Sequence, residues 1–140
     1  MLKASTKKRP PIVVENDEHE RLVGLALSAL GRVPGAVDLF VELSRARTVK
    51  ALPRAAIGID SVITFDYDGS RYRDFVLVDP HRADFARGRI SVITSVGAML
   101  LGLSEGQSIE WTGDDGRSHW LKVVDVNADE GGETVSITRL

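Results

Sequence analysis

Three histidines carry the most versatile chemistry in this chain of 140 residues. A histidine can act as a general base or bind a metal, but His19, His81 and His119 lie far apart, and no two of them have the spacing of metal ligands. We expect His19 to be exposed in a first helical turn and His119 to lie on the outer face of a strand. A histidine brought next to a serine by folding stays an open alternative, although no serine stands in a nucleophile-elbow pattern.

Two pairs of carboxylates are the candidates for holding a cation. Asp114 and Asp115 stand between glycines, where aspartates usually form a hairpin turn. Asp38 and Glu42 are one helical turn apart, but no third ligand accompanies them, so a solvated helix face is the favoured interpretation. The sequence therefore predicts neither a metal site nor a cofactor.

The motifs of common enzymes are absent from the sequence. There is no cysteine, which excludes disulfides, thiolate metal sites and cysteine nucleophiles. There is no P-loop and no dinucleotide fingerprint, so no glycine-rich loop would cradle a nucleotide phosphate. We therefore predict that the protein is not an enzyme, and we name no catalytic residue.

The overall charge does not direct the protein to one kind of partner. The 18 basic and 20 acidic residues give a net charge of −2, so no global field attracts nucleic acid or a membrane. No apolar run approaches the ~20 residues that cross a bilayer, and no secretory signal is recognisable. We expect a cytoplasmic protein without a membrane partner. Basic residues gather in two clusters, and the second is suited either to capping a helix or to binding a partner. The clusters are Lys3, Lys7, Lys8 and Arg9, and Arg45, Arg47, Lys50 and Arg54.

The first third of the chain has a helical pattern. Residues 1–11 are typical of a flexible basic arm. Residues 12–52 predict a short antiparallel helical hairpin, or coiled coil, whose first helix is capped at Asn16-Asp17 and whose second fades at 49–52. The breaker-rich connection between the helices forms the hairpin tip, which comprises Gly31, Arg32, Val33, Pro34 and Gly35.

Residues 57–127 have the pattern of an antiparallel sheet with one short helix. Strands are expected at 62–67, 72–78, 90–93, 109–111 and 119–126, with hairpin turns at 68–69 and 113–116. Thr94 is the natural N-cap of the helix, and a slip in the in–out pattern at Val123-Val124 indicates a bulge. We interpret Trp111 and Trp120 as a cross-strand core pair, with an exposed contact patch as the alternative. For residues 128–140 the pattern predicts an acidic turn and a further edge strand.

A resemblance to a known family lies in residues 88–111, GRISVITSVGAMLLGLSEGQSIEW. The order of a strand, a capped helix ending in Leu-Leu-Gly, a loop and a second strand resembles the C-terminal domain of the bacterial GreA/GreB transcript-cleavage factors. Upstream, residues 41–46 are similar to the end of that family's second helix, and residues 60–62 to its first strand. The likeness spans about 11–126, and within the family it looks most like the Rnk type, the regulators of nucleoside diphosphate kinase.

The resemblance implies an α+β fold, with an FKBP-like sheet domain behind a projecting hairpin. It also implies binding to bacterial RNA polymerase, with the hairpin entering the mouth of the secondary channel and any nucleic-acid contact being indirect, within the transcription complex. In Gre factors, carboxylates at the hairpin tip hold magnesium at the polymerase active site and stimulate transcript cleavage. Here the tip has no carboxylate and the arms are short, so the resemblance implies competition with Gre factors without cleavage.

The family's polymerase-binding segment corresponds to the start of the short helix. Ser95 and Ile93 stand where Gre factors commonly have a proline and a polar residue, and Ala98 stands where they have an arginine, so the contact residues depart from the family pattern. The residues that the resemblance places against polymerase are Ile93, Thr94, Ser95, Val96, Ala98 and Leu101.

Two other functions stay open. An FKBP-like fold would suit a peptidyl-prolyl isomerase or chaperone, but that activity needs an aromatic-lined pocket, and most of the aromatic residues are required for the core. The name of the Rnk type suggests an adaptor that regulates nucleoside diphosphate kinase, for which no residue shows a mechanism.

Overall fold

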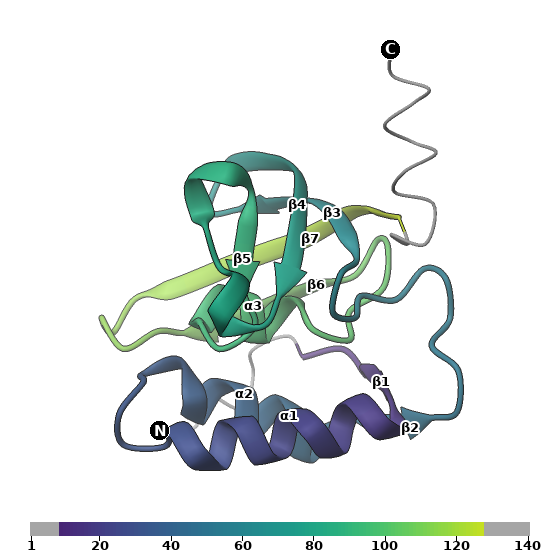
Figure 1. Ribbon diagram of the computed structural model, residues 1–140. Coiled ribbons are helices and arrows are strands. Elements are labelled where there is room, and N and C mark those ends of the chain that lie inside the picture. The colour runs from purple at the N-terminus through teal and green to yellow at the C-terminus, as the bar shows by residue number, and fades with distance from the viewer. Residues whose placement is uncertain (1–8, 128–140) are drawn as a thin grey trace.

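A curled five-stranded sheet forms the body of the protein in the computed structural model, which describes residues 9–127 (Figure 1). The strand order is β5-β4-β3-β7-β6. The strands are β3 (Val62–Tyr67), β4 (Ser70–Val78), β5 (Arg89–Ser91), β6 (Ser108–Thr112) and β7 (Ser118–Asn127). The α+β class is confirmed. The predicted edge strand after residue 127 and most of the predicted basic arm lie outside the described residues.

One pair of strands departs from the predicted antiparallel sheet. β5 runs parallel to β4, whereas the other neighbouring strands are antiparallel. The reason is the connection between them, which turns twice through short 3-10 helices (Pro80–Arg82 and Phe85–Arg87) and brings the chain back in its original direction. The sheet is therefore mixed.

The predicted turn chemistry of the sheet is confirmed. Asp68 and Gly69 both have positive φ, 47° and 91°, as the tight turn between β3 and β4 requires. The bulge in β7 is also present, because Thr64 faces Asp125 and Phe65 faces Val123, which leaves Val124 as the extra residue. The bulge increases the local twist of the sheet and helps it to curl.

The helix α3 (Ser95–Leu100) fills the concave side of this sheet. Thr94 is its N-cap, as predicted, because its Oγ1 accepts a hydrogen bond from the Gly97 amide at 3.0 Å. The same hydroxyl donates to the Ser91 carbonyl at 2.8 Å, so it ties the end of β5 to the helix. Gly97, Ala98, Met99 and Leu100 are buried.

We expect Thr94→Ala to lower the free energy of unfolding by about 1 kcal/mol, because the Gly97 amide loses its acceptor. Chemical denaturation of the two proteins measures the difference. Thr94→Ser is the matched control, since it keeps the hydroxyl and should retain most of the stability. A Thr94→Ala protein as stable as the parent would show that the cap contributes nothing.

Two helices form a second layer beneath the body: α1 (Asn16–Ala29) and α2 (Gly35–Arg45) (Figure 1). They run side by side in opposite directions. The predicted cap is wrong, because α1 begins one residue earlier and Glu15 accepts hydrogen bonds from the Asp17 and Glu18 amides. The predicted end of the second helix is also wrong, because the helix stops at Arg45 and the chain becomes β2 (Arg47–Val49), which pairs in parallel with β1 (Val13–Glu15).

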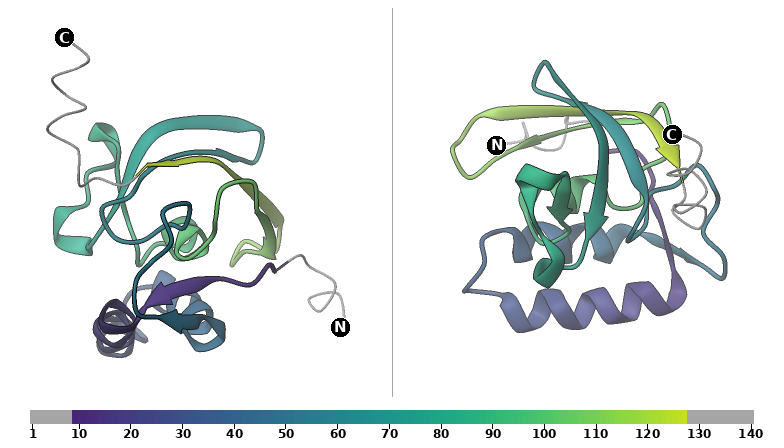
Figure 2. Two further views of the ribbon diagram at one scale, coloured as in Figure 1. Left: turned by 90° about the vertical axis from the view of Figure 1, so that its right-hand side faces the viewer. Right: turned by 45° about the horizontal axis from the view of Figure 1, so that its top comes forward.

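The prediction that the helical pair projects is wrong. Both helices lie flat along the body, with α2 against α3, in each of the views (Figures 1 and 2). The physical reason is that their apolar faces belong to the same core as the sheet. Side chains buried in this shared core include Leu22, Ala26, Leu39 and Leu43 from the helices and Phe65, Met99, Leu100, Ile109 and Leu121 from the body.

Candidate partner-binding groove at the helical tip

The structure brings together the two segments that the sequence suggested separately for function. Gly35, at the end of the tip, packs directly on the backbone before α3, where a Cβ would lie 1.8 Å from the Ile93 carbonyl oxygen. Next to this contact, the Ser95 hydroxyl donates to Asp38 Oδ2 at 2.6 Å. Tip and segment therefore form one surface.

The six predicted polymerase-binding residues divide by burial. Ile93, Ala98 and Leu101 are 6 %, 0 % and 1 % exposed, so their side chains belong to the core. We expect these three to shape the segment rather than to reach a partner. Thr94 is exposed, and Ser95 and Val96 are half-buried at the surface. These last three stay the predicted contact residues.

The tip is held close to the body, and four of its five residues remain accessible. Gly31, Arg32 and Pro34 are exposed, Val33 is half-buried and Gly35 is buried. Arg32 donates a hydrogen bond to the Ser28 carbonyl at 2.6 Å, near the end of α1.

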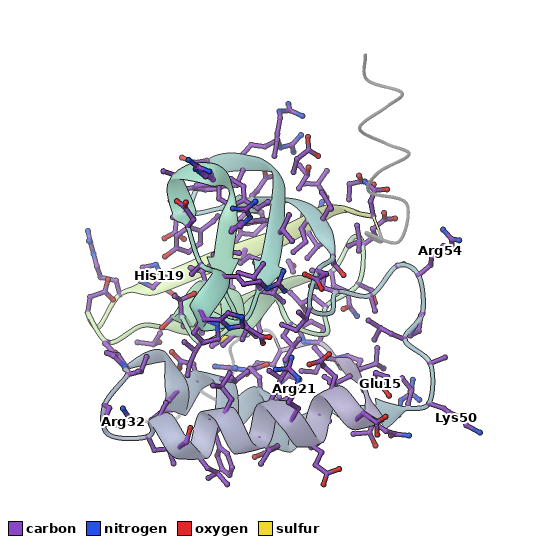
Figure 3. All side chains as sticks on the ribbon, viewed as in Figure 1. Glu15, Arg21, Arg32, Lys50, Arg54 and His119 are labelled. Atoms are coloured by element: carbon purple, nitrogen blue, oxygen red, sulfur yellow. The ribbon has the colours of Figure 1, made fainter. Side chains whose placement is uncertain are left out.

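Two clefts meet at Asp114, in the turn that joins β6 to β7, and the first of them extends to the tip. The first has a volume of about 380 Å³ and is lined by tip residues together with Val37, Asp38 and Asp114. The second, of about 250 Å³, is lined by Tyr67, Ser95, Trp111, Gly113, Asp114, Asp115 and His119. Because Asp114 lines both, we treat the two clefts as one feature, the tip groove. Arg32 and His119 mark this end of the molecule in Figure 3.

His119 lines the tip groove. The prediction that it lies on the outer face of the sheet is therefore wrong. His119 stands opposite Trp111 in the β6–β7 register, and its ring stacks on Tyr67 with centroids 5.9 Å apart. Trp120, next along the strand, therefore points the other way and is 37 % exposed, so the predicted tryptophan core pair is wrong. The pattern missed this because alternation identifies two faces without saying which one is buried.

Both ring nitrogens of His119 meet carboxylates. Nδ1 is 2.6 Å from Asp68 Oδ2, and Nε2 is 3.1 Å from Asp115 Oδ2. No ring nitrogen is left to activate Ser95, whose hydroxyl is bonded to Asp38. The histidine–serine alternative that the sequence left open is therefore not assembled in this groove.

The electrostatics of these three groups are mutually reinforcing. The hydrogen bond to Asp68 raises the pKa of His119 above its ordinary value, against partial burial, and Asp115 adds to the effect. Burial opposes the ionisation of Asp68, but the His119 ring and the Trp120 amide together lower its pKa. The Arg117 amide, followed by His119, lowers the pKa of Asp115. The three shifts each favour the ionised form of the group concerned.

The interpretation of Glu42 as part of a solvated helix face is wrong. The Glu42 side chain is 1 % exposed and forms ion pairs with Arg9 and Arg45. Arg9 lies 33 residues away in sequence, which is why no local pattern predicted the pair. Asp38 turns instead to Ser95. Within residues 9–127, no three histidine, aspartate or glutamate side chains are grouped so that they could hold a metal ion.

No helix within residues 9–127 has the length and apolar character that a membrane span needs.

Comparison with known proteins gives concordant results. The family model described as "Transcription elongation factor, GreA/GreB, C-term" matches residues 52–128. Proteins called "Regulator of nucleoside diphosphate kinase" from Escherichia coli K12 and Shigella flexneri are each 30 % identical over 122 residues, which cover 84 % of this chain and 90 % of theirs. Both carry the name of a regulator.

A solved structure supports the same relationship. The prokaryotic transcription elongation factor GreA/GreB from Nitrosomonas europaea superposes with a TM-score of 0.63 at 30 % identity, covering 85 % of this chain and 99 % of that one. The family match covers the sheet, α3 and both strands of the β6–β7 hairpin, and the regulators match across most of the chain. The chain therefore belongs to the GreA/GreB transcription elongation factor family and is similar, within it, to the regulators of nucleoside diphosphate kinase.

Proposed function

We propose that this protein is an RNA polymerase-binding transcription regulator of the Rnk type, which occupies the region of the secondary channel without stimulating transcript cleavage and competes there with Gre-type factors. Family membership and the similarity to regulators of nucleoside diphosphate kinase support the polymerase partner. The observation that carries the proposal is the docked helical tip, whose Gly35 rests on Ile93 and which bears no carboxylate of its own.

A docked tip limits what the protein can do at a distant active site. The nearest carboxylates, Asp38 and Asp114, line the tip groove but are carried by the body and the base of α2. They cannot be extended into another protein's catalytic centre while the helices share the core with the sheet. We therefore expect no stimulation of RNA cleavage when the protein is added to backtracked elongation complexes. Transcript shortening above the rate of polymerase alone would overturn this part of the proposal.

The contact surface that we propose consists of Thr94, Ser95 and Val96 together with the exposed tip residues, because these lie at the same end of the molecule. Val96 is half-buried and packs beside the core, so it can anchor a partner without a large cost in ordering.

Val96→Ser should weaken binding to purified polymerase about tenfold, equivalent to about 1.4 kcal/mol. The matched control is Val41→Ser, on α2 outside the tip groove, where the valine is 47 % exposed and its loss should leave affinity unchanged. Fluorescence anisotropy with labelled protein gives both affinities, and circular dichroism verifies folding. Equal affinities for the two variants would remove Val96 from the interface.

A second candidate is regulation of nucleoside diphosphate kinase, which the name of the relatives suggests. The kinase activity measured with and without a molar excess of this protein tests a direct effect. An unchanged rate would confine any such role to an indirect one. The FKBP-like description of the sheet stays a prediction, and a proline-isomerisation assay tests the activity that it would suggest.

A further inference from the structure

His119 joins two turns that are distant in sequence. Asp68 belongs to the turn between β3 and β4, Asp115 belongs to the turn between β6 and β7, and the ring lies between them. Each carboxylate is also fixed by a backbone amide: Trp120 donates to Asp68 Oδ1 at 2.8 Å and Arg117 donates to Asp115 Oδ1 at 2.9 Å. The carboxylates of Asp68 and Asp115 are therefore oriented toward the ring by backbone hydrogen bonds that do not involve the ring itself.

The arrangement requires the charged form of the ring. An ionised carboxylate only accepts hydrogen bonds, so both nitrogens of His119 must donate, and only the imidazolium carries two N–H groups. A neutral imidazole would lose one of the two bonds and set a nitrogen lone pair against a carboxylate. Tyr67 and Trp111 hold the ring plane in place, with centroids 5.9 and 5.6 Å from it.

The other groups that face the ring do not replace this interaction. The Tyr67 hydroxyl of β3 is 3.4 Å from Nδ1, and burial followed by the charges of Asp68 and Asp115 raises its pKa, so it stays neutral where the histidine titrates. On the β6–β7 turn, Asp114 and Arg117 bear opposite charges, and Arg117 acts on Asp115. A Cβ on Gly113 would be 2.8 Å from the ring, so the turn rests directly on it.

We propose that His119 is a proton-operated clasp: as an imidazolium it fastens the β6–β7 turn to the β3–β4 turn and fixes the wall of the tip groove, and as a neutral imidazole it releases that turn. Asp115 is the side that opens, because its contact is longer than that of Asp68 and its side chain is 46 % exposed against 38 %.

The direction of the pH dependence follows from the signs of the shifts. The pKa of His119 is raised, so the stabilisation that the clasp adds is complete below about 6.5, the ordinary histidine value, and is lost as pH rises through the folded-state pKa. The pKa values of Asp68 and Asp115 are lowered, so the clasp also opens in acid, when these groups are protonated. It is closed between these two limits.

Nuclear magnetic resonance of the full chain tests the clasp without any partner. We expect the His119 ring to titrate above 6.5, and the amides of Gly113 and Gly116 to shift with the same midpoint. In His119→Gln those amides should no longer follow pH in this range, and their hydrogen exchange should be about tenfold faster. His81→Gln, on the β4–β5 connection, is the matched control and should leave the midpoint unchanged.

One further variant distinguishes a ring that holds the two turns together from a ring that is only packed between them. Asp115→Asn should lower the His119 midpoint while the amide spectrum of the core stays that of the parent. A ring that titrates at or below 6.5, or turn amides that ignore its titration, would overturn the proposal.

The consequence for binding rests on the proposed function. A fixed groove wall is preorganised for a partner, so polymerase affinity should fall severalfold from pH 6 to 8.5, and His119→Gln should lose this dependence while His81→Gln retains it. A normal ring titration without polymerase binding would count against the proposed function alone. A polymerase affinity that changes equally with pH in His119→Gln and the parent would show that the clasp does not act on the groove.

Discussion

Replacing Gly35 by alanine is expected to lower the free energy of unfolding by about 3 kcal/mol, at the upper end of the usual cost of overpacking. The added Cβ would stand 1.8 Å from the Ile93 carbonyl oxygen, 2.7 Å from its carbon and 2.8 Å from the Thr94 Cα. All three are backbone atoms, so no side chain can rotate away. Either α2 or the segment before α3 must move, and the helical layer separates from the body at the tip.

Gly24→Ala is the matched control for this substitution. Gly24 lies within α1, and a Cβ there meets nothing within 4 Å. Alanine favours a helix interior over glycine, so this variant should gain roughly 0.5–1 kcal/mol. Urea denaturation of the parent and both variants gives the two differences. A Gly35→Ala protein with parental stability would mean that the tip does not rest on Ile93, and the docked arrangement of the helices would be wrong.

Removal of the Glu42 carboxylate is the second substitution with a large expected effect. The side chain is 1 % exposed, and its oxygens face the guanidinium groups of Arg9 and Arg45, with Arg45 Nε at 2.9 Å from Oε1. Arg45 also donates to the Pro10 carbonyl at 2.7 Å, so Glu42 holds the N-terminal segment against α2. Glu42→Ala leaves two arginines without their anion and should cost about 3 kcal/mol.

A second variant separates the contribution of the Glu42 charge from that of the Glu42 side-chain packing. Glu42→Gln keeps the shape and an acceptor oxygen, so it should cost less than Glu42→Ala. Glu20→Gln, an exposed position on α1, is the control for charge alone and should stay within about 0.5 kcal/mol of the parent. Thermal and urea denaturation supply the measurements. A Glu42→Ala protein as stable as the Glu20→Gln control would contradict the pairing.

The parts of the fold that follow from local chemistry were predictable. β3 occupies the predicted residues, because its alternation is bounded by the strong Asp68-Gly69 turn signal. Thr94 caps α3 as predicted, because a hydroxyl just before an apolar helical stripe can accept a hydrogen bond from a free amide of the first turn. β1 and β2 were harder to predict: three residues each are too few for a period, and their pairing joins segments on either side of the helical pair.

The docking of the helices could not be predicted from their apolar stripes. An amphipathic stripe shows that one face is buried, but it does not say whether the partner is the neighbouring helix alone or also the body. The close approach of α2 depends on Gly35, and glycine in a breaker-rich connection is more simply explained as a turn residue. The resemblance to longer-armed factors favoured projection, and the shared core excludes it.

The candidate site was predictable in its pieces but not in its assembly. The tip and the start of α3 were each identified, yet the Ser95–Asp38 hydrogen bond that joins them spans 57 residues of sequence. The two carboxylates that meet His119 come from turns that the sequence identified only as turns, and the ring comes from strand β7. A long-range cluster of this kind leaves no periodic signal, because each member is determined by its own local structure.

Binding to purified bacterial RNA polymerase is the decisive measurement for the proposed function. Labelled protein should bind core polymerase saturably, with a dissociation constant at or below the micromolar range, and a Gre factor should displace it in proportion to its own affinity. The absence of binding at micromolar concentrations by protein that is folded by circular dichroism would contradict the account. Binding that no Gre factor can displace would place the protein elsewhere on the enzyme and contradict its occupation of the secondary channel.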